Sequence, residues 1–299
     1  MSNIKAWLVS FRLRTLPLAL STIFMGSIIA AWQNSFNADV LIWAAITTLF
    51  LQILSNLAND YGDAKSGADN ESRVGPQRMI QKGVISLKQM KTAMVICVLL
   101  SLISGITLLF KSFSQLQWQQ LLFFILGISA IAAAIRYTVG TNPYGYRGLG
   151  DVYVFIFFGL LGVAGTWFLH TNIWQWHVLL PAVTIGLFSA GVLNLNNIRD
   201  LDSDRQSNKI TLVVRMGKKA AAWYHLSLIT AGWISMVTFI YLNDAISHFW
   251  PLLITLPLFI RNILVVFRNK EAQNLDGELR NLALSTLMFV LLGGVKLFF

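Results

Sequence analysis

Nine long apolar segments constrain this chain more than any other feature of its sequence. They lie near residues 15–33, 40–58, 91–110, 118–138, 151–169, 177–196, 220–240, 247–267 and 281–298. A bilayer core of about 30 Å needs about 20 apolar residues in a helix, and a helix satisfies its backbone polar groups internally. Only 12% of the residues are charged, about half the share of a soluble domain. We therefore expect an all-α, polytopic membrane protein with about nine transmembrane helices.

The first apolar segment has a second interpretation. It follows Arg12 and Arg14 and ends in small residues, which is also the pattern of a secretory signal peptide. Because eight further apolar segments follow, we expect an uncleaved first helix. The single cysteine, Cys97, lies in an apolar segment. One cysteine excludes an intrachain disulfide and argues against a cysteine-based metal site.

The basic residues predict the orientation of the helices. A net charge of +10 is by itself compatible with nucleic-acid binding, but the positions of the basic residues between the apolar segments favour another explanation. With the N-terminus inside, all but two of the 23 Lys and Arg residues fall on the inner side, the exceptions being Lys111 and Lys296. This asymmetry is the positive-inside pattern. We expect an integral plasma (inner) membrane protein with a cytoplasmic N-terminus, its functional loops on the cytoplasmic side, and no nucleic-acid partner.

Two clusters of acidic and amide residues end two apolar segments on that same side. Asn59 and Asp63 end the second segment, and Asn196, Asp200 and Asp204 end the sixth. Residues four apart share a helix face, so each cluster predicts a row of oxygen atoms. The matched positions predict two pseudo-repeated halves, about 10–138 and 151–267, followed by a last helix at 281–298, in a single domain 1–299. Such halves would bring the clusters together across a central cavity.

Oxygen ligands without nearby His or Cys favour Mg²⁺, which takes one or two carboxylates and accepts phosphate oxygens from a substrate. The candidate metal ligands are Asn59, Asp63, Asn196, Asp200 and Asp204, with Asp60 behind the first pair. A single cluster of this kind is also compatible with a solvated acidic helix end. Two clusters at matched positions favour a diphosphate held by metal ions, because carboxylates beside a membrane cavity are costly and usually functional.

Basic residues in the same loops fit the same ligand. The candidates for binding diphosphate are Arg78, Lys82, Arg205, Lys209 and Arg147, with Arg73 nearby. Each is also explained by the orientation rule. The third loop, residues 137–151, is rich in tyrosine and glycine and predicts either a cap over the site or an interfacial tyrosine belt.

The segments 59–63 (Asn-Asp-Tyr-Gly-Asp) and 197–204 (Asn-Ile-Arg-Asp-Leu-Asp-Ser-Asp) resemble the two aspartate-rich motifs of the UbiA superfamily of intramembrane prenyltransferases. The resemblance covers essentially the whole chain. Segments 14–17, 56–63, 81–85 and 143–150 are similar, more narrowly, to the 1,4-dihydroxy-2-naphthoate polyprenyltransferases of menaquinone biosynthesis. One position departs from the general pattern, because its last Asp would fall at Gly67; Asp69 is the nearest substitute.

The resemblance implies a Mg²⁺-dependent enzyme with a UbiA-type fold around a central cavity. It implies transfer of a polyprenyl group from polyprenyl diphosphate to 1,4-dihydroxy-2-naphthoate, with loss of CO₂, giving demethylmenaquinone. The expected catalytic residues are Asp60, Asp63, Asp200, Asp204 and Tyr137, the last of which would shield a carbocation or orient the acceptor.

Two alternatives remain. One is another aromatic acceptor, such as 4-hydroxybenzoate or a homogentisate-like compound. The other is a cation-coupled transporter, which is disfavoured because the acidic clusters lie at helix ends rather than in mid-span.

Overall fold

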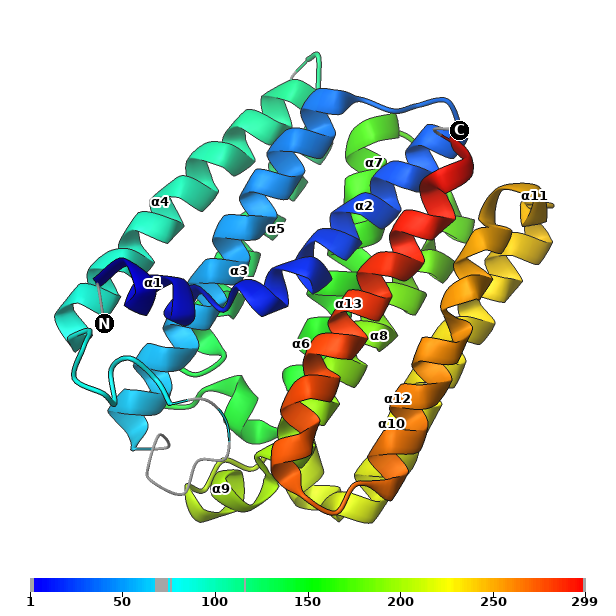
Figure 1. The fold of residues 1–299 in the computed structure, drawn as a ribbon. Coiled ribbons are helices and arrows are strands. Elements are labelled where there is room, and N and C mark those ends of the chain that lie inside the picture. The colour runs from blue at the N-terminus through cyan, green and yellow to red at the C-terminus, as the bar shows by residue number, and fades with distance from the viewer. Residues whose placement is uncertain (1–2, 68–74, 76, 116, 298–299) are drawn as a thin grey trace.

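The chain folds into a bundle of long, roughly aligned helices (Figure 1). The structure, a computed structural model, describes residues 3–67, 75, 77–115 and 117–297. All regular secondary structure in these residues is helical, and nine of the helical spans are long and apolar enough to cross a membrane. The predicted all-α, polytopic fold is therefore confirmed.

The helices follow the predicted order. The first four spans are α1 (Asn3–Phe11) with α2 (Leu16–Trp32), α3 (Ala38–Ser66), α4 (Leu87–Ser112) and α5 (Trp118–Arg136). The fifth is continuous through α6 (Gly150–Val154), a π-helical segment η3 (Phe155–Gly165) and α7 (Thr166–Thr171). The sixth is α8 (Leu179–Arg199), followed by the short α9 (Leu201–Gln206). The last three are α10 (Leu212–Leu242), α11 (Ile246–Phe249) with α12 (Leu256–Arg268), and α13 (Leu275–Gly294).

Several spans are longer than predicted, and two of these differences concern acidic residues. The second was expected to end near residue 58, but α3 continues to Ser66, so the first acidic cluster is helical. The ninth was expected from residue 281, but its span begins at Ala272. Its first turn carries Asp276 and Glu278, and both carboxylates are neutralised by arginines of other helices. This pairing lets the helix start earlier than hydropathy indicates.

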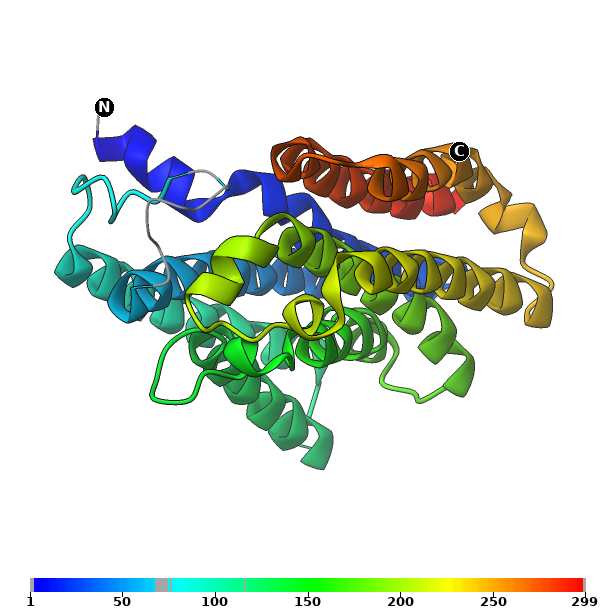
Figure 2. The same cartoon turned by 90° about the horizontal axis from the view of Figure 1, so that it is seen from below.

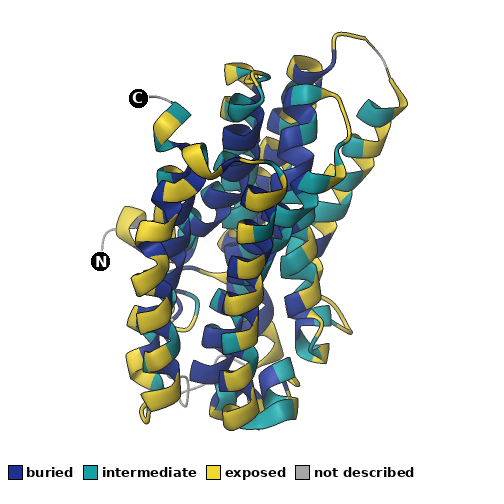
Figure 3. Ribbon diagram, turned by 90° about the vertical axis from the view of Figure 1, so that its right-hand side faces the viewer, coloured by how far each residue is buried: buried dark blue, intermediate teal, exposed yellow. Residues whose placement is uncertain are grey.

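The outward faces of the bundle are apolar. Large side chains such as Phe110, Leu121 and Tyr241 are 68%, 62% and 79% exposed, and Figure 3 shows exposed residues along the outer faces of the long helices. A water-soluble protein does not expose apolar surface on this scale. The molecule is therefore an integral membrane protein whose helices face lipid.

Small residues hold the fifth span close to its neighbours. A Cβ at Gly159 would lie 2.6 Å from the carbonyl oxygen of Ala182 in α8, and one at Gly162 would lie 2.8 Å from Thr22 Cβ in α2. Only glycine allows such close approach of membrane helices. The fifth span is thereby fixed between α2 and α8, where its π-helical segment lines the interior.

Both acidic motifs lie at the same end of the bundle. The first occupies the last turns of α3 and the second the junction of α8 and α9, and we call this end the motif end. Seen from below in Figure 2, α12 and α13 form one face of the molecule and α5 lies on the opposite face, with α3 and α8 between them. The internal repeat of two halves stays a prediction.

Candidate active site

A cavity of about 400 Å³ runs into the bundle from the motif end. Its walls come from α2, α3, α4, α5, the fifth span and α8. Asp63 and Ala44 of α3 both line it and are 19 residues apart (63 − 44), which corresponds to about 28 Å along a helix. At the end away from the motifs, its lining includes Ile23, Leu108 and Leu109 of a buried apolar cluster. The cavity is thus long and apolar, with a polar mouth.

The first motif divides between two faces of α3. Asn59 and Asp63, four residues apart, line the cavity, whereas Asp60 lies outside its lining. The Asp60 carboxylate accepts hydrogen bonds from Arg12, at 2.5 Å, and from Arg78. The second Nη of Arg78 lies 3.6 Å from Asp63 Oδ2. One guanidinium therefore holds both carboxylates of the first motif, and all three side chains are buried.

The packing around Gly62 explains why the first motif has a glycine at this position. A Cβ at Gly62 would lie 2.6 Å from both the carbonyl oxygen and Oγ1 of Thr138. Thr138 Oγ1 donates to the Ala58 carbonyl at 2.9 Å and lies 3.3 Å from Asn59 Oδ1. The start of the third loop is therefore docked directly on the first motif.

The second motif lies at a break between two helices. Asp200 ends α8 and begins α9, and its backbone carbonyl accepts from the N–H of Asp204 at 2.8 Å. Arg199 donates through Nε and Nη2 to the two oxygens of Asp200, at 2.8 and 2.7 Å, and through Nη2 to Asn196 Oδ1 at 2.8 Å. A two-point contact of this kind fixes the orientation of the carboxylate.

Lys209 lies between the two motifs. Its Nζ is 3.4 Å from Asp204 Oδ1 and 5.6 Å from the centroid of the Tyr146 ring. Burial alone would lower the pKa of Lys209, but the nearby carboxylates of Asp63, Asp204 and Asp200 outweigh it and raise the pKa above its ordinary value. The ammonium group is therefore charged, and it faces carboxylates from both motifs.

Asp204 is also electrostatically perturbed. The pKa of Asp204 is raised to about 6, chiefly by burial and in part by the charges of Asp200 and Asp63, while Lys209 opposes the shift. Its Oδ2 is buried and has no hydrogen-bond partner within the part of the chain that the structure describes. A buried carboxylate oxygen without a donor is costly unless a cation binds it.

The third loop covers both motifs. The Tyr146 hydroxyl donates to Asp63 Oδ1 at 2.8 Å and lies 2.9 Å from Ser66 Oγ. The Tyr146 carbonyl accepts from the N–H of Ile210, next to Lys209, at 3.2 Å. Burial raises the pKa of the Tyr146 hydroxyl above its usual value, so it remains a hydrogen-bond donor. The loop thus links the first motif to the segment that carries Lys209.

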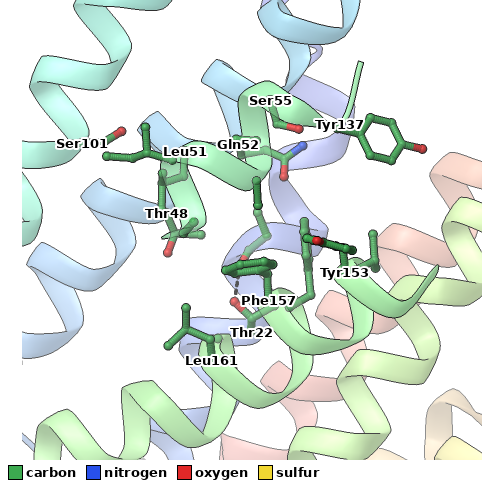
Figure 4. Close-up of a pocket in the computed structure, with 18 of the residues that line it drawn as sticks. Thr22, Thr48, Leu51, Gln52, Ser55, Ser101, Tyr137, Tyr153, Phe157 and Leu161 are labelled. Carbon is green, nitrogen blue, oxygen red and sulfur yellow. Dashed lines mark hydrogen bonds between the residues drawn. The ribbon is translucent and has the colours of Figure 1, made fainter. Parts of the chain in front are cut away.

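Aromatic rings continue from this loop into the cavity. Tyr137 and Tyr144 meet edge to face with centroids 5.3 Å apart, Tyr144 and Tyr153 stack at 3.8 Å, and Tyr153 and Phe157 stack at 6.2 Å. All four line the cavity. Figure 4 shows Tyr153 and Phe157 opposite Leu51 and Gln52 of α3. We call these four residues the aromatic wall.

A second, polar cavity of about 310 Å³ adjoins the first. Both are lined by Arg12, Arg78 and Asn196, and the second is also lined by Arg14 and Arg199. Four guanidinium groups and the Asp60 carboxylate thus line this cavity, and each guanidinium already pairs with an aspartate. An anionic ligand there would share these arginines with their present partners, because arginine binds carboxylate and phosphate in a fork.

The donor set at the mouth of the large cavity fits Mg²⁺ together with a diphosphate. Within the described residues, no group of three or more His, Cys, Asp or Glu is arranged to hold a metal alone. Mg²⁺ commonly takes only one or two protein carboxylates and completes its shell with water and phosphate oxygens. The predicted ligands fit this pattern, because Asn59, Asp63, Asn196 and Asp200 line the mouth and Asp204 has an unpartnered oxygen beside it.

Some predicted residues lie elsewhere. Lys82, Arg147 and Arg205 are exposed and do not line either cavity. Gly67 ends α3 with a φ of 74°, so the position expected to carry a last Asp is a helix stop instead. Asp69 and Arg73 lie outside the described residues.

Sequence reasoning missed several residues that the structure places at the site. Arg12 and Arg14 were interpreted as orientation or signal-peptide charges, and Arg14 as part of the family-like segment 14–17, but neither was predicted as a site residue. Arg199 lies within the second motif and could have been noticed there. Asp276 carries no sequence signal, because its partners are the distant residues Arg14 and Arg199.

Comparison with known proteins agrees with this architecture. Residues 19–289 match the UbiA prenyltransferase family. The chain is 42% identical to a 1,4-dihydroxy-2-naphthoate octaprenyltransferase of Escherichia coli strain K12, over 97% of this chain and 95% of the relative. It is 40% identical to the protein of the same name from Haemophilus influenzae, over 97% and 94% of the two chains. The fold is similar to that of a UbiA homolog from Archaeoglobus fulgidus bound to DMAPP and Mg²⁺, with a TM-score of 0.65, 14% identity, and coverage of 96% and 97%.

Proposed function

The chain belongs to the UbiA prenyltransferase family, and on that premise we propose that it transfers a polyprenyl group from polyprenyl diphosphate to 1,4-dihydroxy-2-naphthoate. In this step of menaquinone biosynthesis, CO₂ is lost and demethylmenaquinone is formed in its reduced quinol form, which oxygen of the air oxidises to the quinone. The identity of 42% over nearly the whole chain to a curated enzyme of this activity supports the assignment. Membership of a prenyltransferase family also favours an enzyme over the alternative of a cation-coupled transporter.

One structural observation carries the mechanism. Both acidic motifs and the Lys209 ammonium lie at the mouth of a long cavity with an apolar, aromatic interior. A polyprenyl diphosphate has the complementary shape and charge, with a highly charged head and a long apolar tail. The head binds at the motifs, and the tail enters the cavity.

At the mouth, Lys209 and Arg78 neutralise diphosphate oxygens from two sides. Asn59, Asp63, Asn196, Asp200 and Asp204 are the residues that would hold Mg²⁺. Bound Mg²⁺ supplies Lewis-acid stabilisation of the negative charge that develops on the departing diphosphate. The protein holds these groups in place before reaction through Arg199, Arg78 and Tyr146, so little reorganisation is needed as charge develops.

The aromatic wall protects the other product of bond breaking. When the C–O bond to diphosphate breaks, the first carbon of the prenyl group becomes an allylic carbocation. The faces of aromatic rings attract cations, and Tyr144 and Tyr153 line the cavity beside the mouth. The apolar lining keeps water from reacting with the cation.

The end of a long polyprenyl tail can leave the bundle beside α5. Ile106 of α4 and Phe124 and Ile128 of α5 line the cavity and are only partly covered by the rest of the protein, at 40%, 40% and 42% exposed. A tail longer than the cavity can therefore pass beside α5 into the lipid.

The aromatic acceptor binds from the second cavity. Its carboxylate fits the guanidinium groups there, and the shared residues Arg12, Arg78 and Asn196 join that cavity to the diphosphate site. The electron-rich ring attacks the allylic carbon, forming a C–C bond. The bond to the ring carboxylate then breaks, its electrons return to the ring, and CO₂ leaves. We assign the motif end to the cytoplasmic side, because nearly all basic residues accompany it.

The experiment that tests this function uses labelled polyprenyl diphosphate and membranes containing the protein. Incubation with 1,4-dihydroxy-2-naphthoate is expected to give a labelled lipid-soluble quinone, while 4-hydroxybenzoate and homogentisate give none. Turnover restricted to another acceptor would refute the naphthoate assignment. Asp63→Ala and Asp200→Ala are each expected to abolish turnover in folded, membrane-inserted protein; retained activity in both would refute the metal-diphosphate site.

A further inference from the structure

We propose that Asp276, in the first turn of α13, is a positioning residue for the second motif. It acts through Arg199 on Asp200 and Asn196 and thereby raises the affinity of the site for a divalent cation with diphosphate. The proposal rests on the proposed function, since it assumes that Asp200 is a metal ligand.

A continuous chain of contacts carries the inference. Asp276 Oδ1 accepts from Arg199 Nη1 at 2.7 Å. The remaining donors of the same guanidinium hold both oxygens of Asp200 and the amide oxygen of Asn196. Asp276 Oδ2 accepts from Arg14 Nη1 at 2.7 Å. One carboxylate of the ninth span thus connects the start of the first span to the second motif.

The position of the Arg199 side chain depends on Asp276 because Arg199 is buried. Its side chain is only 3% exposed, so every N–H that loses its partner there would be buried without one. Removing the partner of a buried charged donor is costly, and the group tends to move in response. Loss of Asp276 would leave Nη1 without its carboxylate, and Arg199 would turn away from its present two-point contact with Asp200.

The charges around Arg199 also predict weaker metal binding when Asp276 is lost. One guanidinium is now divided between two carboxylates, Asp276 and Asp200. Without Asp276, one negative charge beside the second motif is lost, while the positive charge of Arg199 remains. A site with less net negative charge attracts a divalent cation less. Geometry and electrostatics therefore both predict weaker metal binding when Asp276 is lost.

Asp276 is suited to mutation because it is itself partly exposed. Its side chain is 34% exposed, against 3% for Arg199, so removing its charge leaves no fully buried cavity behind. Partners that supply only indirect support to metal ligands typically change metal affinity by about 10- to 100-fold. We expect Asp276→Asn to weaken metal binding by about tenfold, at the lower end of that range.

The test measures Mn²⁺ binding directly in the full-length protein in detergent, with inorganic pyrophosphate present, from the electron paramagnetic resonance signal of free Mn²⁺. Asp276→Asn is expected to raise the dissociation constant about tenfold, and Asp276→Glu to restore part of the affinity because it keeps the charge. Prenyl transfer by Asp276→Asn is expected to recover at high Mg²⁺ concentration. A general loss of structure would not be reversed by added metal.

The matched control is Asp39→Asn. Asp39 also forms an ion pair, at 3.0 Å with Lys111, but it is 52% exposed and lies at the start of α3, away from the motif end. It is expected to bind Mn²⁺ as the unmodified protein does. Equal Mn²⁺ affinity in Asp276→Asn and the unmodified protein would overturn the inference.

A second variant keeps the inference testable if Asp276→Asn fails to fold. Arg199→Lys keeps the charge but cannot hold Asp276 and both oxygens of Asp200 at once, so it is expected to weaken Mn²⁺ binding as well. Unchanged affinity in that variant would also overturn the inference. Failure of the unmodified protein to bind Mn²⁺ with pyrophosphate would instead refute the proposed function.

Discussion

Substitution of Gly62 by alanine is expected to reduce catalysis strongly in a protein that still folds. The added Cβ would lie 2.6 Å from the carbonyl oxygen of Thr138, whereas ordinary contacts begin near 3.4 Å. The loop or the helix must therefore move by about 0.8 Å (3.4 − 2.6). The atom met is backbone, so no flexible side chain can give way.

The magnitude follows from what the two segments carry. Gly62 lies next to Asp63, and Thr138 lies next to Tyr137 of the aromatic wall. A misplacement of about 1 Å in a site costs about 100-fold in rate, so we expect a loss approaching that value. Overpacking of this kind costs about 1–3 kcal/mol of stability. The melting temperature is then expected to fall by roughly 2–4 °C for each kcal/mol.

The assay compares initial rates of labelled prenyl transfer with thermal melting of the same purified protein. Gly277→Ala is the matched control, because it is also a helical glycine but has nothing within 4 Å of the added Cβ. It should retain activity and melt no lower than the unmodified protein, since alanine is the better helix former. Full activity in Gly62→Ala would refute the argument that the Thr138 contact positions the first motif.

Three further variants separate the residues that the structure places at the site from those it does not. Tyr146→Phe removes the hydrogen bond to Asp63 Oδ1; a bond to a charged group contributes about 1.5–3 kcal/mol to stability, so we expect the melting temperature to fall, and the rate to fall at least tenfold because Asp63 loses the donor that orients it. Lys209→Met removes the ammonium between the motifs and is expected to raise the KM for the prenyl donor, and a normal KM measured by donor titration would contradict its role. Arg205→Ala removes an exposed charge outside both cavities, and its kinetic constants should stay within about twofold, because exposed charges contribute about 0–1 kcal/mol.

Patterns within single sequence segments predicted the membrane-spanning helices and part of the candidate site. The apolar segments predicted nine spans because the length of a membrane helix is set by bilayer thickness. The four-residue spacing of Asn59 and Asp63 predicted a shared face, and both line the cavity. In each case the physical cause lies within one helix, so the sequence alone carries it.

What could not be predicted depends on contacts between distant segments. Arg78 and Lys82 are four residues apart in the same basic loop, yet one is buried against two carboxylates and the other is exposed. Nothing in their residue type distinguishes them. Asp276 pairs with Arg199, which lies 77 residues away in the sequence, and only the packing of α13 against the rest of the bundle creates that pair. The early start of the ninth span has the same origin, because tertiary partners neutralise its acidic first turn.

The ion pairs at the motif end have a consequence for how the protein is made. Among the described residues there, five carboxylates form ion pairs with five cationic side chains: the carboxylates are those of Asp60, Asp63, Asp200, Asp204 and Asp276, and the cations are those of Arg12, Arg14, Arg78, Arg199 and Lys209. Concentrated like charge at a membrane cavity would oppose assembly of the helices, but each of these carboxylates has a cationic partner. These ion pairs therefore allow the polypeptide to be inserted and assembled in the bilayer before metal or lipid substrate binds. Chelation of divalent ions should stop turnover and leave the bundle assembled, with a lower melting temperature because bound metal no longer stabilises the folded state.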